Sequence, residues 1–470
     1  MSKISSIMDV GKRSLSNSQT ALQTVSHNIA NKSTEGYSRQ RVDVVTNDPV
    51  SSGRLRIGTG ARASQVSRIN NPWLEKQIQR EDMNLGKAQA RADSLGRVEQ
   101  IYNEQNNKGL NQYMTEFFNS FRELSNAPES LASRTVVKEA ATSLVQDFKR
   151  VNQQLKDVQH DINGQVKTNV EEINQITKEL ASLNEKIQLV EVQGIPANDE
   201  RDRRDLLLKK LGEKIDISWA EGKDSMVSVT AGNTGILVSG LSSRDLVTGP
   251  SEDGNQTDVY YRSSESGTLF NITNQIKGGR LGGALEVRDE IIAQHLDTID
   301  NMAYTLAKEV NRAHIEGYDK YGKKGVLFFD MPETVKDASE TIKLNETLAL
   351  DSGKIATASR KDSPGDNTIS NIISSIQYRK VMDEGNTTLD DYYDAQVGQI
   401  GAIAQRAAKA HENQKNILDQ LTQIRESISG VSLDEEASKM VEMQKAYDAS
   451  ARMIKTADEM FDTVLNLKRL

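Results

Sequence analysis

The chain has 470 residues, of which 36% are hydrophobic, 5% aromatic and 27% charged. This composition suits roughly two to four domains built on helices with narrow apolar stripes better than one thick enzyme core. Its 59 basic and 67 acidic residues give a net charge of −8, too small to indicate binding to nucleic acid or to a membrane. The absence of cysteine excludes disulfides, thiol nucleophiles and cysteine-ligated metal sites.

The N-terminal residues form an amphipathic pattern and not a targeting signal. Ser5, Ser6 and Asp9 interrupt the apolar residues too early for a signal peptide, and no apolar run is long enough to span a membrane. We therefore expect that export, if it occurs, follows a non-classical route.

The first 29 residues carry an apolar stripe whose members are spaced alternately four and three residues apart, which predicts a helix that needs a partner helix. It consists of Ile4, Met8, Gly11, Leu15, Ser18, Leu22, Val25 and Ile29.

Residues 30–68 predict a sharp helix exit followed by short strands around a turn at Asn47 to Pro49. The segment is locally basic, because six arginines (39, 41, 54, 56, 62 and 68) face only Asp43 and Asp48. Two interpretations remain open. The arginines form a solvated hairpin face, or they contact an acidic neighbouring subunit.

Residues 73–192 predict a rod-like helical body. Two helices are expected between Trp73 and Asn126, and a third from about Ser130 to Val192 carries a mostly heptad-like apolar stripe. Its roughly 60 residues would reach about 90 Å if the helix is unbroken. The next predicted helix, residues 199–211, carries the charged run from Arg201 to Asp205, which we interpret as a solvated face.

After Lys214 the apolar residues alternate and glycines punctuate them, which predicts a small antiparallel β domain over residues 217–283. The glycines from Gly278 to Gly283 are expected to form a turn into a helix that resumes after Gly283. On that helix we expect His295 and Asp300 to lie on the surface. Near its end, His314 and Gly317 are expected to cap the helix, with Gly317 in the left-handed conformation.

A mixed segment over residues 328–375 precedes a helix from Thr388 to Ser429, which Gly430 ends. The last segment repeats the spacing of the first, so the chain is expected to begin and end in halves of one coiled coil. Its stripe consists of Leu433, Ala437, Met440, Gln444, Tyr447, Ala451, Ile454, Asp458, Phe461 and Leu465.

Motifs for chemistry are missing from the sequence. The glycines near Arg280 match neither phosphate-binding pattern, and Lys415 occupies the position of the second histidine in the helix that begins with His411 and Glu412. We expect no catalytic residue, no metal and no cofactor.

At this point the motifs permit a comparison with a known family. The run Asn28, Ile29, Ala30 and Asn31, followed by Thr34, Gly36, Tyr37, Ser38, Arg39 and Gln40, resembles the N-terminal signature of bacterial flagellar axial proteins. Within that family, the Tyr-x-Arg-Gln ending is similar to the hook-associated members of the hook-filament junction. Glu35 departs from the family pattern, which often has proline there.

Three further blocks resemble the same family. The first is Arg204, Asp205, Leu206 and Leu207; the second is Gly283, Leu285, Arg288 and Asp289 with Asn311, His314 and Gly317. The third covers residues 432–467, including Leu433, Asp434, Glu435, Glu436, Gln444, Tyr447 and Ser450. Residues 217–283 match weakly.

The resemblance implies a structural adaptor that forms a ring at the tip of the hook. It also implies contacts with the hook protein and hook-associated protein 3, an export chaperone on the C-terminal helix, and type III export without a cleaved signal peptide. The expected interface residues are Leu15, Leu22, Val25, Ile29, Leu433, Met440, Tyr447, Ile454, Phe461 and Leu465.

The predicted fold is mainly α with an inserted β domain. A terminal coiled coil (1–35 and 431–470) adjoins an elongated helical body (36–216 and 284–430) with a hairpin near 40–68, and residues 217–283 form an outward-facing β insert. Two alternatives remain. The chain is another axial protein of hook or rod type, or remotely an enzyme with a site near Trp219, Asp258 and Tyr260 in the insert.

Overall fold

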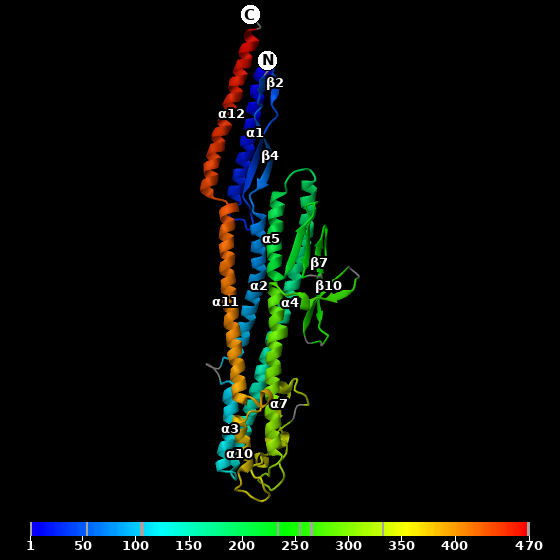
Figure 1. Ribbon diagram of the computed structural model, residues 1–470, viewed down its shortest axis with the longest axis vertical. Helices are drawn as coiled ribbons and strands as arrows, with labels where there is room; N and C mark the ends of the chain where they lie inside the picture. Colours follow the sequence, from blue (N-terminus) through cyan, green and yellow to red (C-terminus); the bar gives the residue numbers. More distant parts are fainter. Residues whose placement is uncertain are drawn as a thin grey trace.

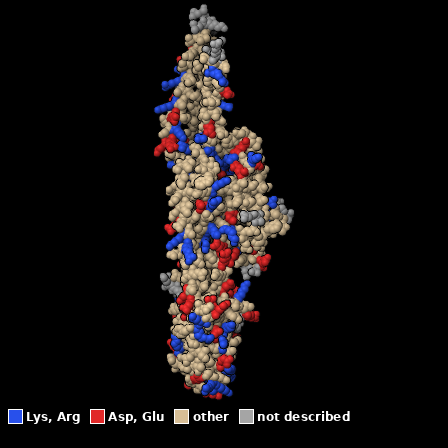
Figure 2. Space-filling view, in the orientation of Figure 1, with Lys and Arg blue, Asp and Glu red and all other residues tan. Residues whose placement is uncertain are grey.

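The computed structural model describes residues 2–52, 55–103, 108–232, 235–252, 254, 256–263, 267–330 and 333–467. The molecule is elongated: a narrow two-helix part extends from a longer helical body, and a β region covers one side of the body (Figure 1). Figure 2 shows the same narrow part, with basic and acidic side chains interspersed over the visible face. The predicted fold class, mainly α with inserted antiparallel strands, is confirmed.

Long helices make up most of the chain. They are α1 Ser2–Ala30, α2 Pro72–Ile101, α3 Leu110–Asn126, α4 Leu131–Glu191, α5 Asn198–Lys214, α6 Gly279–Glu286, α7 Ala293–His314, α10 Thr368–Ser375, α11 Leu389–Ser429 and α12 Leu433–Leu467. The π-helix η2 Val287–Ile292 joins α6 to α7. Short turns follow α7: α8 Ala338–Thr341, α9 Glu346–Leu350, η3 Ser352–Lys354, η4 Ile376–Tyr378 and η5 Asp383–Gly385.

The two longest helices begin where the sequence places a capping residue. The Ser130 hydroxyl accepts a hydrogen bond from the Ser133 N–H, at 3.2 Å, and α4 then continues for 61 residues. The Thr388 hydroxyl accepts one from the Asp391 N–H, at 3.1 Å, and α11 continues until Gly430. These caps satisfy N–H groups that a helix start leaves unpaired.

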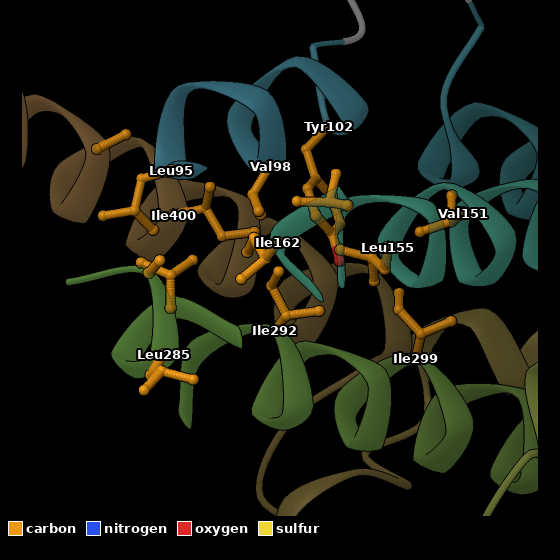
Figure 3. Close-up of a cluster of buried hydrophobic side chains, with 14 of the residues drawn as sticks. Leu95, Val98, Tyr102, Val151, Leu155, Ile162, Leu285, Ile292, Ile299 and Ile400 are labelled. Atoms are coloured by element: carbon orange, nitrogen blue, oxygen red, sulfur yellow. The ribbon is translucent and has the colours of Figure 1, made fainter. Parts of the chain in front are cut away.

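A continuous hydrophobic core runs through the body, where α2, α4, α6, α7 and α11 meet. Figure 3 shows its middle, with side chains from each helix pointing toward one another. The labelled residues are Leu95, Val98, Tyr102, Val151, Leu155, Ile162, Leu285, Ile292, Ile299 and Ile400. Toward the far end of the body, Phe117, Phe121 and Phe328 are fully buried, with ring centroids 5.3 to 5.8 Å apart.

The β region consists of two small antiparallel sheets. One has the order β5-β6-β7-β8, with strands Ile217–Glu221, Val227–Ala231, Gly235–Ser239 and Ser242–Ser243. The other has the order β11-β10-β9, with β9 Leu246–Pro250, β10 Thr257–Arg262 and β11 Leu269–Asn271, before the turn η1 Thr273–Gln275. A further pair, β12 Phe329–Asp330 with β13 Lys343–Leu344, lies beyond α7.

Asparagine side chains of α4 attach the β region to the body. Asn174 binds both the N–H and the C=O of Leu246, each at 2.8 Å. Asn184 binds the N–H and C=O of Val227 at 3.0 and 2.8 Å. A carboxamide offers one donor group and one acceptor, so it can pair with a strand backbone as a neighbouring strand would. The β region is therefore fixed to α4 by backbone recognition.

The three residues proposed for an enzyme site in the insert have structural partners. Trp219 donates its indole N–H to Gln79, Asp258 accepts a hydrogen bond from Asn271 at 2.7 Å, and Tyr260 donates to the Pro250 carbonyl at 2.9 Å. Trp219 belongs to one sheet and the other two residues to the second. The first contact attaches the four-stranded sheet to α2, and the other two join neighbouring strands of the three-stranded sheet.

The N-terminal hairpin lies along α1, whereas the sequence analysis grouped it with the helical body. Strand β1 (Gln40–Thr46) pairs with β4 (Ala61–Arg68), and β2 (Val50–Ser52) pairs with β3 (Leu55–Ile57). Both β1 and β4 contact α1. The base of the hairpin also touches the body, because Asn198 of α5 donates to the Val66 carbonyl at 2.7 Å.

The expected glycine turn is largely helical. Gly279 has a φ of +66° and begins α6, but Gly282 and Gly283 lie inside the helix. A Cβ on Gly283 would lie 2.4 Å from the Lys87 carbonyl oxygen of α2. Gly283 is needed because the backbone of α6 packs against α2, whereas Gly278 and Gly279 lie against residues 214–216.

The polar residues of α7 are more buried than expected. His295 and Asp300, predicted on the surface, are 2% and 3% exposed. Asp300 accepts hydrogen bonds from the N–H groups of Asp337 and Ser339, at 2.8 and 2.9 Å. Asp300 lies away from the apolar stripe of α7, but the segment over residues 333–344 folds over it. His295 lies one helical turn before Ile299 and packs against Tyr102, with ring centroids 6.0 Å apart.

His314 and Gly317 also differ from the expected cap. His314 is fully buried; its Nδ1 donates to the Val326 carbonyl at 2.6 Å, and its Nε2 accepts from the Ala356 N–H at 2.8 Å. Gly317 is not among the residues with positive φ. Glycine is required at this position because a Cβ there would lie 2.8 Å from the Ala356 Cβ. Both residues therefore serve to pack the segment after α7.

The buried His314 predicts a stability loss in acid. Burial lowers its pKa from 6.5 to about 4, and a proton on Nε2 would oppose the Ala356 N–H. Between pH 6.5 and 4 the unfolded chain therefore binds more protons than the folded chain. The stability that neutral His314 contributes is complete above pH 6.5 and is lost as the pH falls toward 4, and the loss is at most about 3 kcal/mol. Thermal melting between pH 7 and 4 should show a smaller pH dependence in His314→Gln than in the unchanged chain. His160→Gln, on the exposed face of α4, is the control, and equal slopes in all three would contradict the assignment.

Candidate assembly interface

The two ends of the chain form one antiparallel helix pair. Gly11 of α1 faces Ile454 of α12 so closely that a Cβ on the glycine would lie 2.7 Å from the Ile454 Cγ1. One helical turn further along α1, the hydroxyls of Ser14 and Ser450 are 2.7 Å apart. Small residues therefore allow the helix backbones to approach closely. Both chain ends lie at the same tip of the molecule (Figure 1).

The structure places the predicted interface residues at different depths. Val25 is buried; Leu15, Leu22, Ile29, Met440, Ile454 and Phe461 are partly exposed; and Leu433, Tyr447 and Leu465 are exposed. All lie on α1 or α12. The intramolecular pair thus covers some of the predicted stripe and leaves a substantial apolar area accessible.

The face of α12 that packs on α1 differs from the predicted stripe at every second stripe position. There the contacting residue is the one directly before the predicted residue. The expected residues Ala437, Gln444, Ala451 and Asp458 are exposed. The residues directly before them, Glu436, Met443, Ser450 and Ala457, are buried or partly buried instead. Because the contacting residues include glutamate, serine and alanine, they do not form an apolar stripe in the sequence. The prediction from apolar spacing therefore assigned the neighbouring residue to the contact.

The hairpin occupies another side of α1. The Asn17 side chain donates to the Ala61 carbonyl at 2.9 Å and accepts from the Ala63 N–H at 2.8 Å. Arg13 donates to the Thr59 carbonyl at 3.0 Å. At 100° per residue, Leu15 and Leu22 lie roughly 140 to 180° around α1 from Arg13 and Asn17. The half-exposed stripe therefore lies far from the hairpin.

Asn28 is the centre of a buried polar cluster where the helix pair meets the body. Its Nδ2 donates to the Gln40 carbonyl and to Glu436 Oε2, both at 2.9 Å. Its Oδ1 accepts from the Tyr37 hydroxyl at 2.7 Å and from the Gln40 N–H at 2.9 Å. All four hydrogen bonds that a carboxamide can form are made. Asn28 thereby joins α1, the following loop, β1 and α12.

Arg39 pairs with the buried carboxylate of Glu436 in the first turn of α12. Glu436 is 1% exposed, and Arg39 Nε donates to its Oε1 at 2.8 Å. Arg39 Nη2 lies 2.8 Å from Glu435 Oε2, and the Arg39 N–H donates to the Ser429 carbonyl at the end of α11. A buried carboxylate requires a paired cation and hydrogen bonds. The arginine of the motif thus fixes where α11 ends and α12 begins.

The remaining motif residues shape the loop between α1 and β1. Asn31 donates to the His27 carbonyl at 3.0 Å and accepts from the Thr34 hydroxyl at 3.1 Å. Gly36 has a φ of +82°, and a Cβ there would lie 3.1 Å from the Leu206 Cβ. Glycine is therefore required both by the left-handed backbone and by contact with α5.

The charged run on α5, interpreted from sequence as a solvated face, is partly buried. Asp202 and Arg204 are 6% and 2% exposed. Asp202 accepts from the Ser38 N–H at 2.8 Å and from Arg68 at 2.7 Å. Its position against the motif loop makes it part of the junction, while Arg204 donates to the Ser225 carbonyl at 2.8 Å. The interpretation as a solvated face is therefore wrong for Asp202 and Arg204, although Arg203 is exposed.

The hairpin arginines have different surroundings. Arg39 and Arg68 are paired within the chain, while Arg41, Arg56 and Arg62 are exposed. Arg54 lies outside the described residues. Neither interpretation fits Arg39 and Arg68, because both pair with acidic residues of this chain. The choice between a solvated face and contact with a neighbouring subunit concerns Arg41, Arg56 and Arg62.

Burial shifts the pKa values of the junction. It raises the pKa of Asp202 above its ordinary value, although Arg68 opposes that rise. It also raises the pKa of the Tyr37 hydroxyl, and the carboxylates of Asp199, Asp202 and Glu436 add to this effect. Tyr37 therefore remains a neutral hydrogen-bond donor to Asn28 at physiological pH.

Arg425 of α11 completes the junction from the other side. It donates to the carbonyls of Gly36 and Tyr37 at 3.2 and 3.3 Å and to Glu75 of α2 at 2.8 Å. Sequence reasoning identified Arg39 but missed Arg425 and the role of Glu436. Arg425 belongs to no apolar stripe or motif, and Glu436 was noted only as part of the C-terminal block that resembles the family, so only the fold reveals their contacts.

Among the described residues, no group of three or more His, Asp or Glu side chains is arranged to hold a metal ion. Likewise, no helix within the described ranges is long and apolar enough to cross a membrane. What the geometry provides is a hydrogen-bonded connection between a helix pair and a rod.

Comparisons with known proteins agree on one family. Residues 95–329 match the family model of the flagellar hook-associated protein FlgK helical domain, and residues 425–467 match that of the flagellar basal body rod FlgEFG protein C-terminal region. Flagellar hook-associated protein 1 of Bacillus subtilis (strain 168) is 30% identical over 98% of this chain and 97% of its own length. The protein of the same name from Escherichia coli (strain K12) is 24% identical over 99% of this chain and 100% of its own.

A solved structure has a similar fold. The flagellar hook junction protein FlgK from Burkholderia pseudomallei superposes with a TM-score of 0.68 at 14% identity, over 75% of this chain and 100% of that chain.

Removing the Asn28 side chain should loosen the junction. Asn28→Ala leaves the Tyr37 hydroxyl, the Gln40 backbone and one oxygen of Glu436 without a buried partner, and we expect a loss of about 2 to 4 kcal/mol in unfolding free energy. Thermal melting and hydrogen exchange of α1 and α12 would measure it. Asn169→Ala, which removes an exposed helix asparagine, should change little. Equal melting of the two variants would refute the central role of Asn28.

Enlarging Gly11 should separate the helix pair. Gly11→Leu places a side chain where Ile454 lies, and overpacking of this kind costs about 1 to 3 kcal/mol. Gly164→Leu is a matched control, because that helix glycine has open space around it and leucine favours helix over glycine. We expect faster amide exchange in α1 only for Gly11→Leu. Unchanged protection of α1 in that variant would rule out close contact at this position.

Proposed function

Because the chain belongs to the family of flagellar hook-associated protein 1 and is thus a structural component of the bacterial flagellum, we propose that it joins hook to filament by assembly through α1 and α12. The observation that supports this mode of assembly is the incomplete burial of the apolar residues along the helix pair. The helix pair leaves Leu433, Tyr447 and Leu465 exposed at 36 to 45%. Apolar side chains at helical spacing with this exposure favour burial by another protein.

The organisation of the chain supports this role. We propose that residues 1–35 and 431–470 act as the assembling unit, that 36–216 and 284–430 form the connecting rod, and that 217–283 face outward. The polar cluster around Asn28 and Glu436 links the first unit to the second. Such a link would transmit the orientation of the helix pair to the body.

The proposed partners follow from the family. They are further copies of this chain in a ring, the hook protein on one side and hook-associated protein 3 on the other. An export chaperone would bind α12, whose exposed Val441, Met453 and Met460 offer an apolar surface before assembly. The relatives are structural proteins of the flagellum, and we propose no enzymatic activity. We further propose delivery to the cell exterior by the flagellar type III apparatus.

A charge in the seam should abolish assembly without unfolding the body. Ile454→Asp or Leu22→Asp introduces a carboxylate into the contact between α1 and α12, and we expect loss of binding to purified hook tips in co-sedimentation. Thr456→Asp, on the exposed side of α12, should bind normally. Circular dichroism would check that the helical body persists. Normal filament growth on cells carrying Ile454→Asp would contradict the proposed interface, and failure of the unchanged chain to bind hook tips would contradict the adaptor role.

A further inference from the structure

The ribbon formed by β2 and β3 has an apolar face that the rest of the chain does not cover. Val50 pairs with Ile57, and Leu55 lies two residues before Ile57, so the three side chains point to the same face. They are 60%, 42% and 69% exposed respectively. Ser51 and Arg56 pair on the opposite face. An amphipathic two-stranded ribbon needs a surface against its apolar face to be stable.

A matching apolar strip lies on the far side of the helix pair. We name this strip the lateral edge; it consists of Leu15, Leu22 and Ile29 of α1 and Leu433, Met440 and Tyr447 of α12, all partly or largely exposed. On α1 it lies roughly 120 to 180° from the residues that hold the hairpin. A chain cannot bring its own ribbon onto this edge while β1 and β4 lie along α1 (Figure 1).

We propose that the ribbon of each copy docks on the lateral edge of the next copy. The proposal rests on the assembly function above and specifies its contact: Val50, Leu55 and Ile57 of one chain cover the exposed apolar side chains of the neighbour's lateral edge. Because the two surfaces are different and lie on opposite sides of α1, the contact is head-to-tail. Repetition of such a contact builds a ring or a helical array and not a closed dimer.

Charge complementarity identifies the occupant of the edge as another copy of this chain. Residues 40–68, which include the ribbon, contain five arginines and two aspartates, and Arg41 and Arg62 of this hairpin are exposed. Helix α12 instead has eight acidic and four basic residues. On its lateral-edge side, Asp458 and Asp462 are exposed. Opposite charges around an apolar centre orient the docking and disfavour the reversed contact of ribbon with ribbon.

The first experiment compares the two faces of the ribbon on hook tips. Leu55→Glu places an acid against the acidic edge of the neighbour and should greatly reduce the amount of chain bound to purified hook tips. Ser51→Glu alters the opposite face of the same ribbon and should retain normal binding. Both positions are exposed, so both variants should melt as the unchanged chain does. Equal binding of the two variants would overturn the ribbon contact.

A second experiment tests the neighbour's surface by cross-linking. The chain contains no cysteine, so a variant with Leu55→Cys and Tyr447→Cys has only these two thiols. Oxidation on hook tips should give a ladder of linked chains. The control, Leu55→Cys with Thr456→Cys, places the second thiol on the opposite side of α12 and should give no ladder.

The outcomes separate this proposal from the adaptor function. Binding to hook tips without a ladder, or with a ladder equal to that of the control, would overturn the ribbon contact and leave the adaptor function standing. Dimers linked through Leu55→Cys alone would show a symmetric contact of ribbon with ribbon and would also overturn the proposal. If the unchanged chain does not bind hook tips, the adaptor function itself fails.

Discussion

The pairing of Asn28 with Glu436 is the constraint on which the arrangement of the whole chain depends. A glutamate that is 1% exposed is stable only if every neighbouring group is in place: the Asn28 amide, the Arg39 guanidinium and the backbone that carries them. These groups come from α1, the loop before β1 and α12, which are more than 400 residues apart at their extremes. Satisfying one carboxylate therefore determines how the first and last helices meet, and how both meet the rod.

Asparagine carboxamides form similar paired hydrogen bonds elsewhere in the molecule. Asn17 binds the hairpin, Asn174 and Asn184 bind the β region, and Asn311 binds the N–H and C=O of Phe329. In each case one side chain satisfies a backbone N–H and a backbone C=O. This pairing attaches short strands to helices without a large apolar contact, and it suits a chain with only 5% aromatic residues. It also explains how small sheets remain ordered on a helical rod.

The sequence predicted the parts of the fold that depend on apolar periodicity and capping. The bounds of α4 and α11 agree with the positions of Ser130, Thr388 and Gly430, because regular heptads and caps determine them locally. The seam of α12 was displaced by one residue, and the burial of Asp202 and Asp300 was missed. These contacts depend on ion pairs and on loops that fold over a helix, which leave no periodic signal. The motif residues were identified by resemblance, but their contacts required the fold.

The break between α11 and α12 has a mechanical consequence. Helix α11 ends at Ser429 and α12 begins at Leu433, so a load applied along the helix pair cannot pass to the rod through one continuous helix. It must cross the two chain links, at Gly430 and between β4 and α2, together with the hydrogen bonds that Asn28, Arg39, Arg425, Asp202 and Asn198 form there. Bending compliance is therefore concentrated at this joint, while the segments on either side remain stiff. Under torque, the angle at the joint would change before either helix bends.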